Sequence, residues 1–277
     1  MKSYWSLLIL CLLATSTFGQ LREASDLESV PRDGIYNKST VASKQMLTYD
    51  HLREADVFWE KRVWRVIDVR EKMNKHFTYP NAPFIKVLLD AATKGDISVY
   101  SAMDDKFSYK LADGEAANIG VTIDTIIILD PITLRETEKI VRNELNWEDV
   151  KRFRIKEVWY IDEETSTMKV RIIGIAPLVE VRDDNDDFRY EQPLFWLYYP
   201  ELRTVLNNKE VVNPVNDANP MSWDNIFEMR YFSSYVYKES NVQDRRLQDH
   251  KTGLDILLEA KKVEKAIFEF EEDIWSK

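Results

Sequence analysis

The chain has 277 residues, of which 38 are basic and 48 acidic, giving a formal net charge of −10 at pH 7. This acidic balance argues against a nucleic-acid partner, because phosphates require a basic surface, and against attraction to an anionic membrane surface. The length is sufficient to bury a sizeable core in one large domain or two small ones.

Residues 1–19 have the three regions of a secretory signal peptide. Lys2 supplies a positive charge, an apolar run follows, and small residues lead to a cleavage point after Gly19. The apolar run is too short to span a hydrocarbon core of about 30 Å. Cys11, the only cysteine, lies within the predicted signal peptide, so we expect no disulfide or thiolate in the mature chain. These features predict an exported, soluble protein.

The segment 20–49 is polar and aperiodic and contains few large apolar side chains. Such a segment cannot bury enough surface to fold alone. We interpret it as a polar N-terminal arm that is either flexible or ordered by docking onto a neighbour. The predicted folded domain covers 50–277, and a subdivision near residue 146 is the alternative organisation.

Apolar residues recur at helical spacing between His51 and about Lys75, after Asp50, which is a favourable N-cap. They are Leu52, Ala55, Trp59, Val63, Val66 and Met73. This pattern predicts a long N-terminal helix of roughly 35 to 40 Å. Prolines then interrupt the chain, and a second helix is expected over 84–94, ended by Gly95.

The middle of the chain favours antiparallel strands. The clearest is a hairpin of 153–161 and 168–181, because β-branched and aromatic residues dominate both arms around a polar connection. A helix is expected at 133–145, and Ser222 is expected to cap a short helix. Further short strands are predicted at 97–100, 107–111, 125–129, 194–199 and 231–238.

The last helix of the chain carries apolar residues at alternating steps of four and three, which is the spacing of a coiled-coil seam. They are Ile256, Ala260, Val263, Ile267, Phe270 and Ile274. A helix packed on its own domain is the alternative, which so short a run favours. The predicted fold class is therefore α+β, mainly antiparallel sheet, with a long N-terminal helix and a C-terminal helix.

No motif for nucleotide binding, nucleophilic catalysis or a zinc site occurs in the sequence. The glycines are too dispersed for a phosphate-binding loop, no nucleophile elbow is present, and the three histidines lack ligand spacing. The acidic run Asp183 to Asp187 resembles a calcium loop, but Phe188 and Leu194 occupy the glycine and glutamate positions of an EF-hand. We interpret that run as a solvated loop and expect no cofactor. A glycan-binding or glycan-cleaving protein is the alternative function, although the many carboxylates single out no pair.

The stretch from Gln192 to Arg203 is rich in large apolar and aromatic side chains and poor in reactive polar groups. Aromatic residues are favoured at protein–protein hot spots, which indicates an assembly component. We consider Trp59, Trp64, Phe195 and Tyr198 as partner-facing positions. The alternative is that all four are core residues, since tryptophan is highly buried on average.

Several long blocks resemble the family of gliding-motility proteins called GldN, or PorN. The most similar blocks are Met168 to Pro177, Pro193 to Pro200 and Phe232 to Arg245, and Trp59 to Lys75 and Gly253 to Trp275 are similar too. The similarity covers most of the mature chain and is weakest before Tyr49 and around Asp183 to Asp187. Its specificity depends on the order of these blocks and not on a short motif.

The resemblance implies a non-enzymatic periplasmic component of the type IX secretion system of Bacteroidota. Proteins of this family associate with the lipoprotein GldK, or PorK, in large rings at the inner leaflet of the outer membrane. They also contact the periplasmic part of GldM, or PorM, in the proton-driven GldL–GldM motor. The implied role is protein secretion and, in gliding species, motility. We therefore expect homo-oligomeric contacts in a ring, peripheral attachment to the outer membrane through the lipoprotein, and no nucleic-acid partner.

Overall fold

The computed structural model describes residues 45–112, 115, 119, 121–129, 136–144, 147–182, 187–213, 216, 218 and 221–275. These residues all belong to one compact unit, Thr40–Lys277. The predicted signal peptide, the arm up to residue 44 and the acidic run at 183–186 lie outside the described residues.

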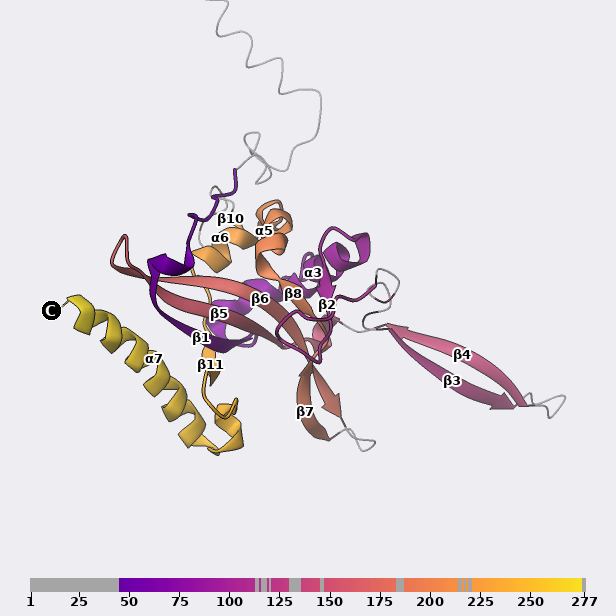
Figure 1. Cartoon of the computed structure of the whole chain (residues 1–277). Coiled ribbons are helices and arrows are strands. Elements are labelled where there is room, and N and C mark those ends of the chain that lie inside the picture. Colours follow the sequence, from indigo (N-terminus) through magenta and orange to yellow (C-terminus); the bar gives the residue numbers. More distant parts are fainter. Residues whose placement is uncertain are drawn as a thin grey trace, which may run out of the picture. The chain divides into compact units, whose positions relative to one another are not determined.

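Seven antiparallel strands form the main sheet, in the order β11-β1-β5-β6-β8-β2 with β7 also paired to β6 (Figure 1). They are β1 (Val57–Asp68), β2 (Val99–Tyr100), β5 (Arg152–Asp162), β6 (Thr167–Arg182), β7 (Phe188–Pro193), β8 (Trp196–Tyr198) and β11 (Tyr235–Glu239). The predicted hairpin is confirmed as β5 and β6, whose ladder runs from Asp162↔Thr167 to Arg152↔Leu178. The antiparallel part of the fold prediction is therefore correct.

The long helix predicted between His51 and Lys75 is wrong. That stretch forms a short 3-10 helix (Glu54–Asp56), the strand β1, and a second 3-10 helix (Lys72–Thr78). β1 pairs with β5 at one edge and with β11 at the other, and its second half, residues 63–68, is buried on both faces. In that half Val63, Trp64, Val66 and Ile67 are apolar residues on both faces, so strict alternation is lost and the pattern imitates the wide apolar surface of a buried helix. The β-branched and aromatic residues of Val57–Asp68 favour the strand.

Two further sheets have two strands each. The strands β9 (Glu210–Val211) and β10 (Met221–Ser222) form one, and β3 (Val121–Leu129) and β4 (Glu136–Glu144) form the other. The strand predicted at 125–129 is thus confirmed within β3, whereas the helix predicted at 133–145 is wrong, since β4 occupies it. The backbone of β4 pairs with the whole length of β3, from Val121↔Glu144 to Leu129↔Glu136. A complete partner strand outweighs the weak helical periodicity of this polar segment.

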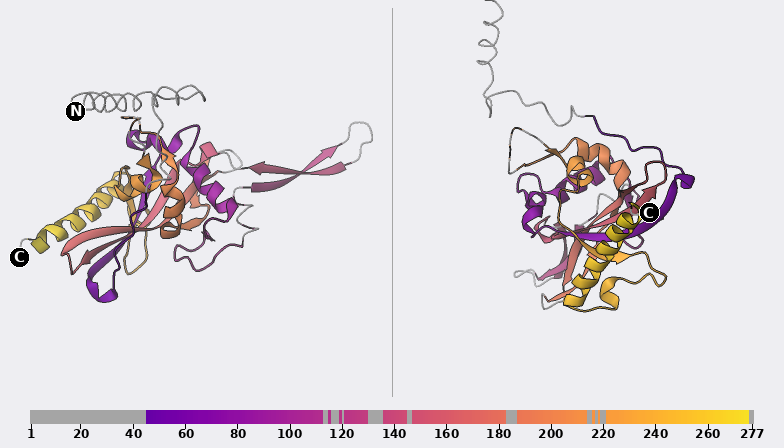
Figure 2. Two further views of the ribbon diagram at one scale, coloured as in Figure 1. Left: turned by 90° about the horizontal axis from the view of Figure 1, so that it is seen from above. Right: turned by 90° about the vertical axis from the view of Figure 1, so that its left-hand side faces the viewer.

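Four α-helices are described: α3 (Phe84–Lys94), α5 (Tyr199–Asn207), α6 (Trp223–Glu228) and α7 (Leu254–Trp275). Helix α3 is confirmed at its predicted bounds, and Gly95 ends it with a left-handed φ of 75°. Ser222 caps α6 as predicted, because its hydroxyl accepts a hydrogen bond from the Asn225 N–H at 3.2 Å. The C-terminal helix is confirmed as α7, an unbroken helix (Figure 2).

The main core lies between one face of the sheet and the helices α3, α5 and α6. Odd-numbered residues of the central strands, such as Ile67 and Ile155, contribute to it. Aromatic rings fill its centre, where the centroids of Phe84 and Trp223 are 4.4 Å apart. Burying each such large side chain stabilises the fold by about 1.5 to 3 kcal/mol.

Helix α7 packs on the same face of the sheet, beyond the main core. Its residues Ala260, Val263 and Ile267 are buried against Val63 of β1 and Val236 of β11. At the far end of the contact the ring of Phe270 lies 4.8 Å from that of Trp59. The residues of the predicted coiled-coil seam therefore pack on their own domain, which was the alternative interpretation.

The second face of the sheet has a different chemistry. Here the even-numbered residues of β1 and β5 include Trp64, Arg154 and Lys156, and Trp64 forms a small cluster with Ala176 and Trp196. Tyr100, Phe107 and Tyr237 pack against this cluster. We call this side the cationic face, in contrast to the apolar face that the helices cover.

Replacing Phe195 with alanine should strongly destabilise the protein. Phe195 has no exposed surface, so a cavity and lost burial should reduce the free energy of unfolding by about 3 to 5 kcal/mol. Phe58 is 71 % exposed and serves as the matched control, for which Phe58→Ala should stay within about 0.5 kcal/mol of the parent. Urea denaturation measures both, and a mild effect of Phe195→Ala would contradict its core position.

His76 should make stability pH-dependent between about pH 6.5 and 4. Burial lowers the pKa of His76 to about 4, and its Nε2 has no hydrogen-bond partner. The unfolded chain, with a histidine pKa near 6.5, binds the proton more readily, so stability is complete above that pH and falls as the pH decreases through the window. Urea titrations at several pH values measure the free energy of unfolding, which should decrease less between pH 6.5 and 4 in His76→Gln than in the parent. An equal decrease in both proteins would show that His76 is not the cause.

Candidate interaction site

The four predicted partner-facing residues all take part in internal packing. Phe195 lies in the main core, and Trp64 is only 6 % exposed on the cationic face. Trp59 is half-buried beneath Phe270 of α7, and Tyr198 is half-buried with its ring edge-on to Phe107 at 5.6 Å. Of the four, the structure brings Trp64 and Tyr198 to the same face of the sheet.

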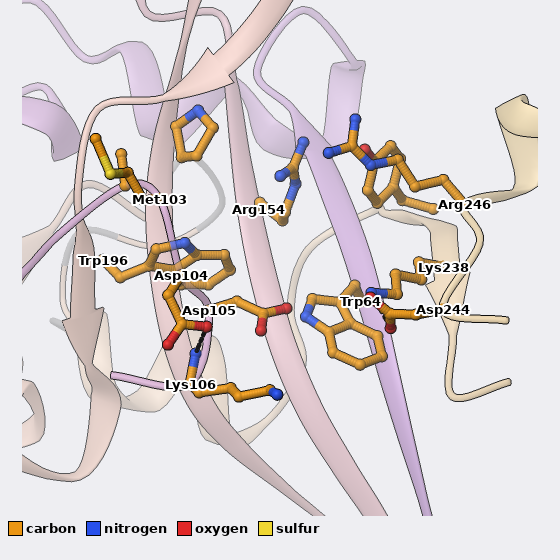
Figure 3. A pocket seen from close by; sticks show the side chains of 13 residues that line it. Trp64, Met103, Asp104, Asp105, Lys106, Arg154, Trp196, Lys238, Asp244 and Arg246 are labelled. Atoms are coloured by element: carbon orange, nitrogen blue, oxygen red, sulfur yellow. Dashed lines mark hydrogen bonds and ion pairs between the residues drawn. The ribbon is translucent and has the colours of Figure 1, made fainter. Parts of the chain in front are cut away.

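A pocket of about 330 Å³ opens on the cationic face (Figure 3). Strands β1, β5, β8 and β11 supply Trp64, Arg154, Trp196 and Tyr237, respectively. Strand β11 also supplies Lys238, and two loops, 102–106 and 244–246, supply the other charged groups. Pro193 lines the cavity as well. We call this cavity the sheet pocket.

The loop at one side of the sheet pocket is held by its own hydrogen bonds. Asp104 accepts hydrogen bonds from the Lys106 N–H at 2.9 Å and from the Ser108 hydroxyl at 2.6 Å. The Ser108 hydrogen bond is the larger cause of the lowered pKa of Asp104. The ammonium of Lys156 donates to the backbone carbonyl of Asp105, which attaches the loop to β5.

Phe107 anchors the same loop in the sheet. Its ring packs over Gly174 of β6, where an added Cβ would lie 2.5 Å from the Phe107 Cζ and 3.3 Å from the Leu197 carbonyl. Glycine in the strand therefore permits a close approach that no other residue allows. Phe107 also has a positive φ of 60°, a conformation uncommon for a bulky side chain.

Two arginines of the sheet pocket lie against one tyrosine ring. The Arg154 guanidinium is 4.3 Å from the ring centroid of Tyr237, and that of Arg246 is 5.7 Å from it. Burial lowers the pKa of Arg154, and the charge of Arg246 lowers it further. The Arg154 Nε and the Trp64 Nε1 have no hydrogen-bond partner.

The start of the described chain is fixed to the helices by a buried ion pair. Arg203 of α5 donates from Nε and Nη2 to the two carboxylate oxygens of Asp224 in α6, at 2.9 and 3.2 Å. Arg203 also donates to the Leu47 carbonyl at 2.8 Å and lies 4.1 Å from the ring centroid of Tyr49. The last residues of the predicted arm thus dock onto their own domain.

Within the described ranges no group of three or more His, Cys, Asp or Glu side chains is arranged to hold a metal ion. The acidic run Asp183 to Asp187, which resembles a calcium loop in sequence, lies outside the described residues except for Asp187. No helix in the described part of the chain combines the length and the apolar character needed to cross a bilayer.

The fold is an α+β scaffold with one helix-covered face and one face that carries aromatic and charged side chains, of which the aromatic residues and arginines are types enriched at protein–protein interfaces. The family model described as gliding motility associated protein GldN matches residues 52–276. The chain therefore belongs to the GldN family, and the resemblance inferred from the sequence blocks is confirmed. The match begins shortly before β1 and ends with α7. No curated protein matches the chain.

The sheet pocket was not predicted from the sequence. One sequence pattern points to the face on which it lies. Phe153 and Ile155 alternate with Arg154 and Lys156, which marks a strand with one apolar and one cationic side. That alternation does not reveal that Arg246, from a distant loop, lies beside Arg154. Only the tertiary structure, which places the loop after β11 next to β5, brings the two guanidinium groups to the same tyrosine ring.

Replacing Gly174 with alanine should displace Phe107 and loosen the loop at 101–110. The new methyl would overlap the ring, so we expect a loss of about 1 to 3 kcal/mol of stability and faster amide exchange at Ser101 and Leu111, whose N–H groups bond Tyr109 and Val99. Combining Gly174→Ala with Phe107→Leu should recover part of the stability. Unchanged exchange in the single variant would contradict the close approach.

Proposed function

We propose that this chain is an exported structural subunit of the type IX secretion system, which serves protein secretion and, in gliding species, motility. The observation that carries the proposal is the GldN family match over residues 52–276. The signal-peptide pattern of residues 1–19 supports delivery to the periplasm. The family is described by its association with gliding motility, which agrees with a role in assembly and not in catalysis.

The proposed assembly is a periplasmic ring with a GldK-like lipoprotein, which also contacts a GldM-like component of the motor. In this arrangement the lipoprotein attaches the ring to the outer membrane, because Cys11 lacks the small residues that precede a lipidated cysteine. A closed ring requires two complementary surfaces on every protomer, so that each copy contacts its neighbours head to tail.

One surface suited to such a contact is the outer side of the first turns of α7. Leu254, Leu257 and Leu258 are between 49 and 70 % exposed there, while the opposite side of the helix is buried on the sheet. Clustered exposed apolar side chains mark interaction surfaces more often than isolated ones do. We call these residues the outer leucines and place a neighbouring subunit of the ring against them.

The proposal is tested by purifying the tagged mature protein from detergent-solubilised envelopes. Mass spectrometry should find a GldK-like lipoprotein with it, and negative-stain images should show ring particles. A monomer without that lipoprotein would overturn the proposal and direct attention to a glycan-binding or glycan-cleaving role, which a polysaccharide screen would examine.

The variant Leu254→Ser/Leu258→Ser should fold normally but assemble poorly. Substitutions at exposed positions change stability by about 0.5 kcal/mol or less, whereas the loss of two apolar contacts should reduce recovery of ring particles at least tenfold. The control is Val242→Ser, which alters a fully exposed valine in the loop that precedes α7, outside the outer leucines. Normal ring recovery from the double variant would exclude the outer leucines as a contact.

A further inference from the structure

The sheet pocket has no part in the proposed ring contacts, yet its walls carry more positive than negative charge. Four cationic and three acidic side chains line it, which leaves one net positive charge. The cationic side chains are Lys106, Arg154, Lys238 and Arg246, and the acidic ones are Asp104, Asp105 and Asp244. A single excess charge suits a monoanion such as a carboxylate better than a doubly charged phosphate.

The acidic groups already have partners within the chain. Asp104 accepts a hydrogen bond from Ser108 at 2.6 Å, and Asp244 lies 2.6 Å from the ammonium of Lys238. Asp105 lies 3.8 Å from the ammonium of Lys156. These carboxylates are therefore occupied by groups other than the two arginines.

The arginines lack such partners. Among the described residues neither Arg154 nor Arg246 forms an ion pair, and both guanidinium groups lie against Tyr237. The Arg154 Nε is buried without an acceptor. Two neighbouring guanidinium groups repel each other, so an anion bound between them would lower their energy and accept bidentate hydrogen bonds from them.

Trp64 supplies a second, independent indication of a ligand. This residue lines the sheet pocket, it is only 6 % exposed, and its buried indole N–H has no acceptor. A buried donor without a partner costs about 1 to 3 kcal/mol. In Figure 3 its ring lies among the charged groups of the sheet pocket. A carboxylate there would satisfy this donor as well as the Arg154 Nε.

The walls also define what accompanies the carboxylate. Trp64, Trp196 and Pro193 provide apolar surface next to the cationic groups. The volume of about 330 Å³ is near the lower limit of ligand pockets, which suits one amino-acid residue and not a lipid anchor. We propose that the sheet pocket binds the carboxylate of a protein segment whose neighbouring group is apolar or aromatic, such as a C-terminal residue.

The test uses N-acetylphenylalanine as the probe and N-acetylphenylalanine amide as its uncharged counterpart. The Trp64 indole N–H signal, assigned with Trp64→Phe, is followed by ¹H–¹⁵N NMR during titration of the full mature chain. The acid should shift this signal saturably with a dissociation constant of about 1 mM or lower, equivalent to about −4 kcal/mol. The amide should leave the signal in place, because it brings no negative charge.

The variants identify the groups that bind. Arg154→Gln should weaken binding of the acid at least tenfold, and Arg246→Gln, at an exposed position, should do so even if Arg154→Gln fails to fold. Arg62→Gln removes an exposed arginine from the same face outside the sheet pocket and should bind as the parent does. Equal shifts with acid and amide, no shift at all, or full binding by Arg246→Gln would overturn the proposal.

Inorganic phosphate distinguishes a carboxylate site from a general anion site. At equal concentration it should displace the acid only weakly, because the sheet pocket has one net positive charge. If phosphate displaces the acid completely, the carboxylate assignment is wrong. These measurements need no ring and no lipoprotein, so their outcome is independent of the proposed assembly.

Discussion

The alternation of side chains along β1 and β5 is the constraint on which the rest of the structure depends. Each central strand places aliphatic residues such as Val63 and Ile155 under the helices and aromatic or cationic ones such as Trp64 and Lys156 on the opposite face. Trp64 and Lys156 are cross-strand partners, and each lies beside a register irregularity in its strand. Irregularities of this kind strengthen the twist of a sheet, and here they occur where the sheet pocket is formed.

Buried charges reinforce this alternation. Glu157 is completely buried on the apolar face and pairs with Arg230 at 2.9 Å, while its neighbour Trp159 donates to the same carboxylate. A slip of one residue in the pairing of β5 would turn Lys156 toward the core and Glu157 toward the cationic face. Breaking a buried pair costs about 3 to 5 kcal/mol, so the native register is strongly preferred.

The sequence was sufficient for elements whose signals are local. The hairpin of β5 and β6 has two long β-rich arms around a polar turn, and α3 has a glycine at its end. For β1 the periodicity was ambiguous because the second half of the strand is buried on both faces, and for β4 the deciding factor was a partner strand. The family was recognisable from long blocks, but the sheet pocket could not be predicted because Arg154 and Arg246 meet only through tertiary structure. Phe195 could not be distinguished from a partner-facing residue, because its burial also depends on which elements pack against it in the tertiary structure.

The position of β1 in the sheet also affects when the protein can fold. The Arg65 side chain bonds Ser234 and Glu264, which are 169 and 199 residues later in the chain. Contacts between residues so distant in sequence require closure of long loops, which slows folding. A chain that emerges from a ribosome or a translocation channel N-terminus first exposes β1 long before its neighbour β11 arrives. During that interval β5 can pair with one edge of β1, but the edge that pairs with β11 has no partner strand. This architecture therefore requires protection of that edge from aggregation until the C-terminal part of the chain has emerged.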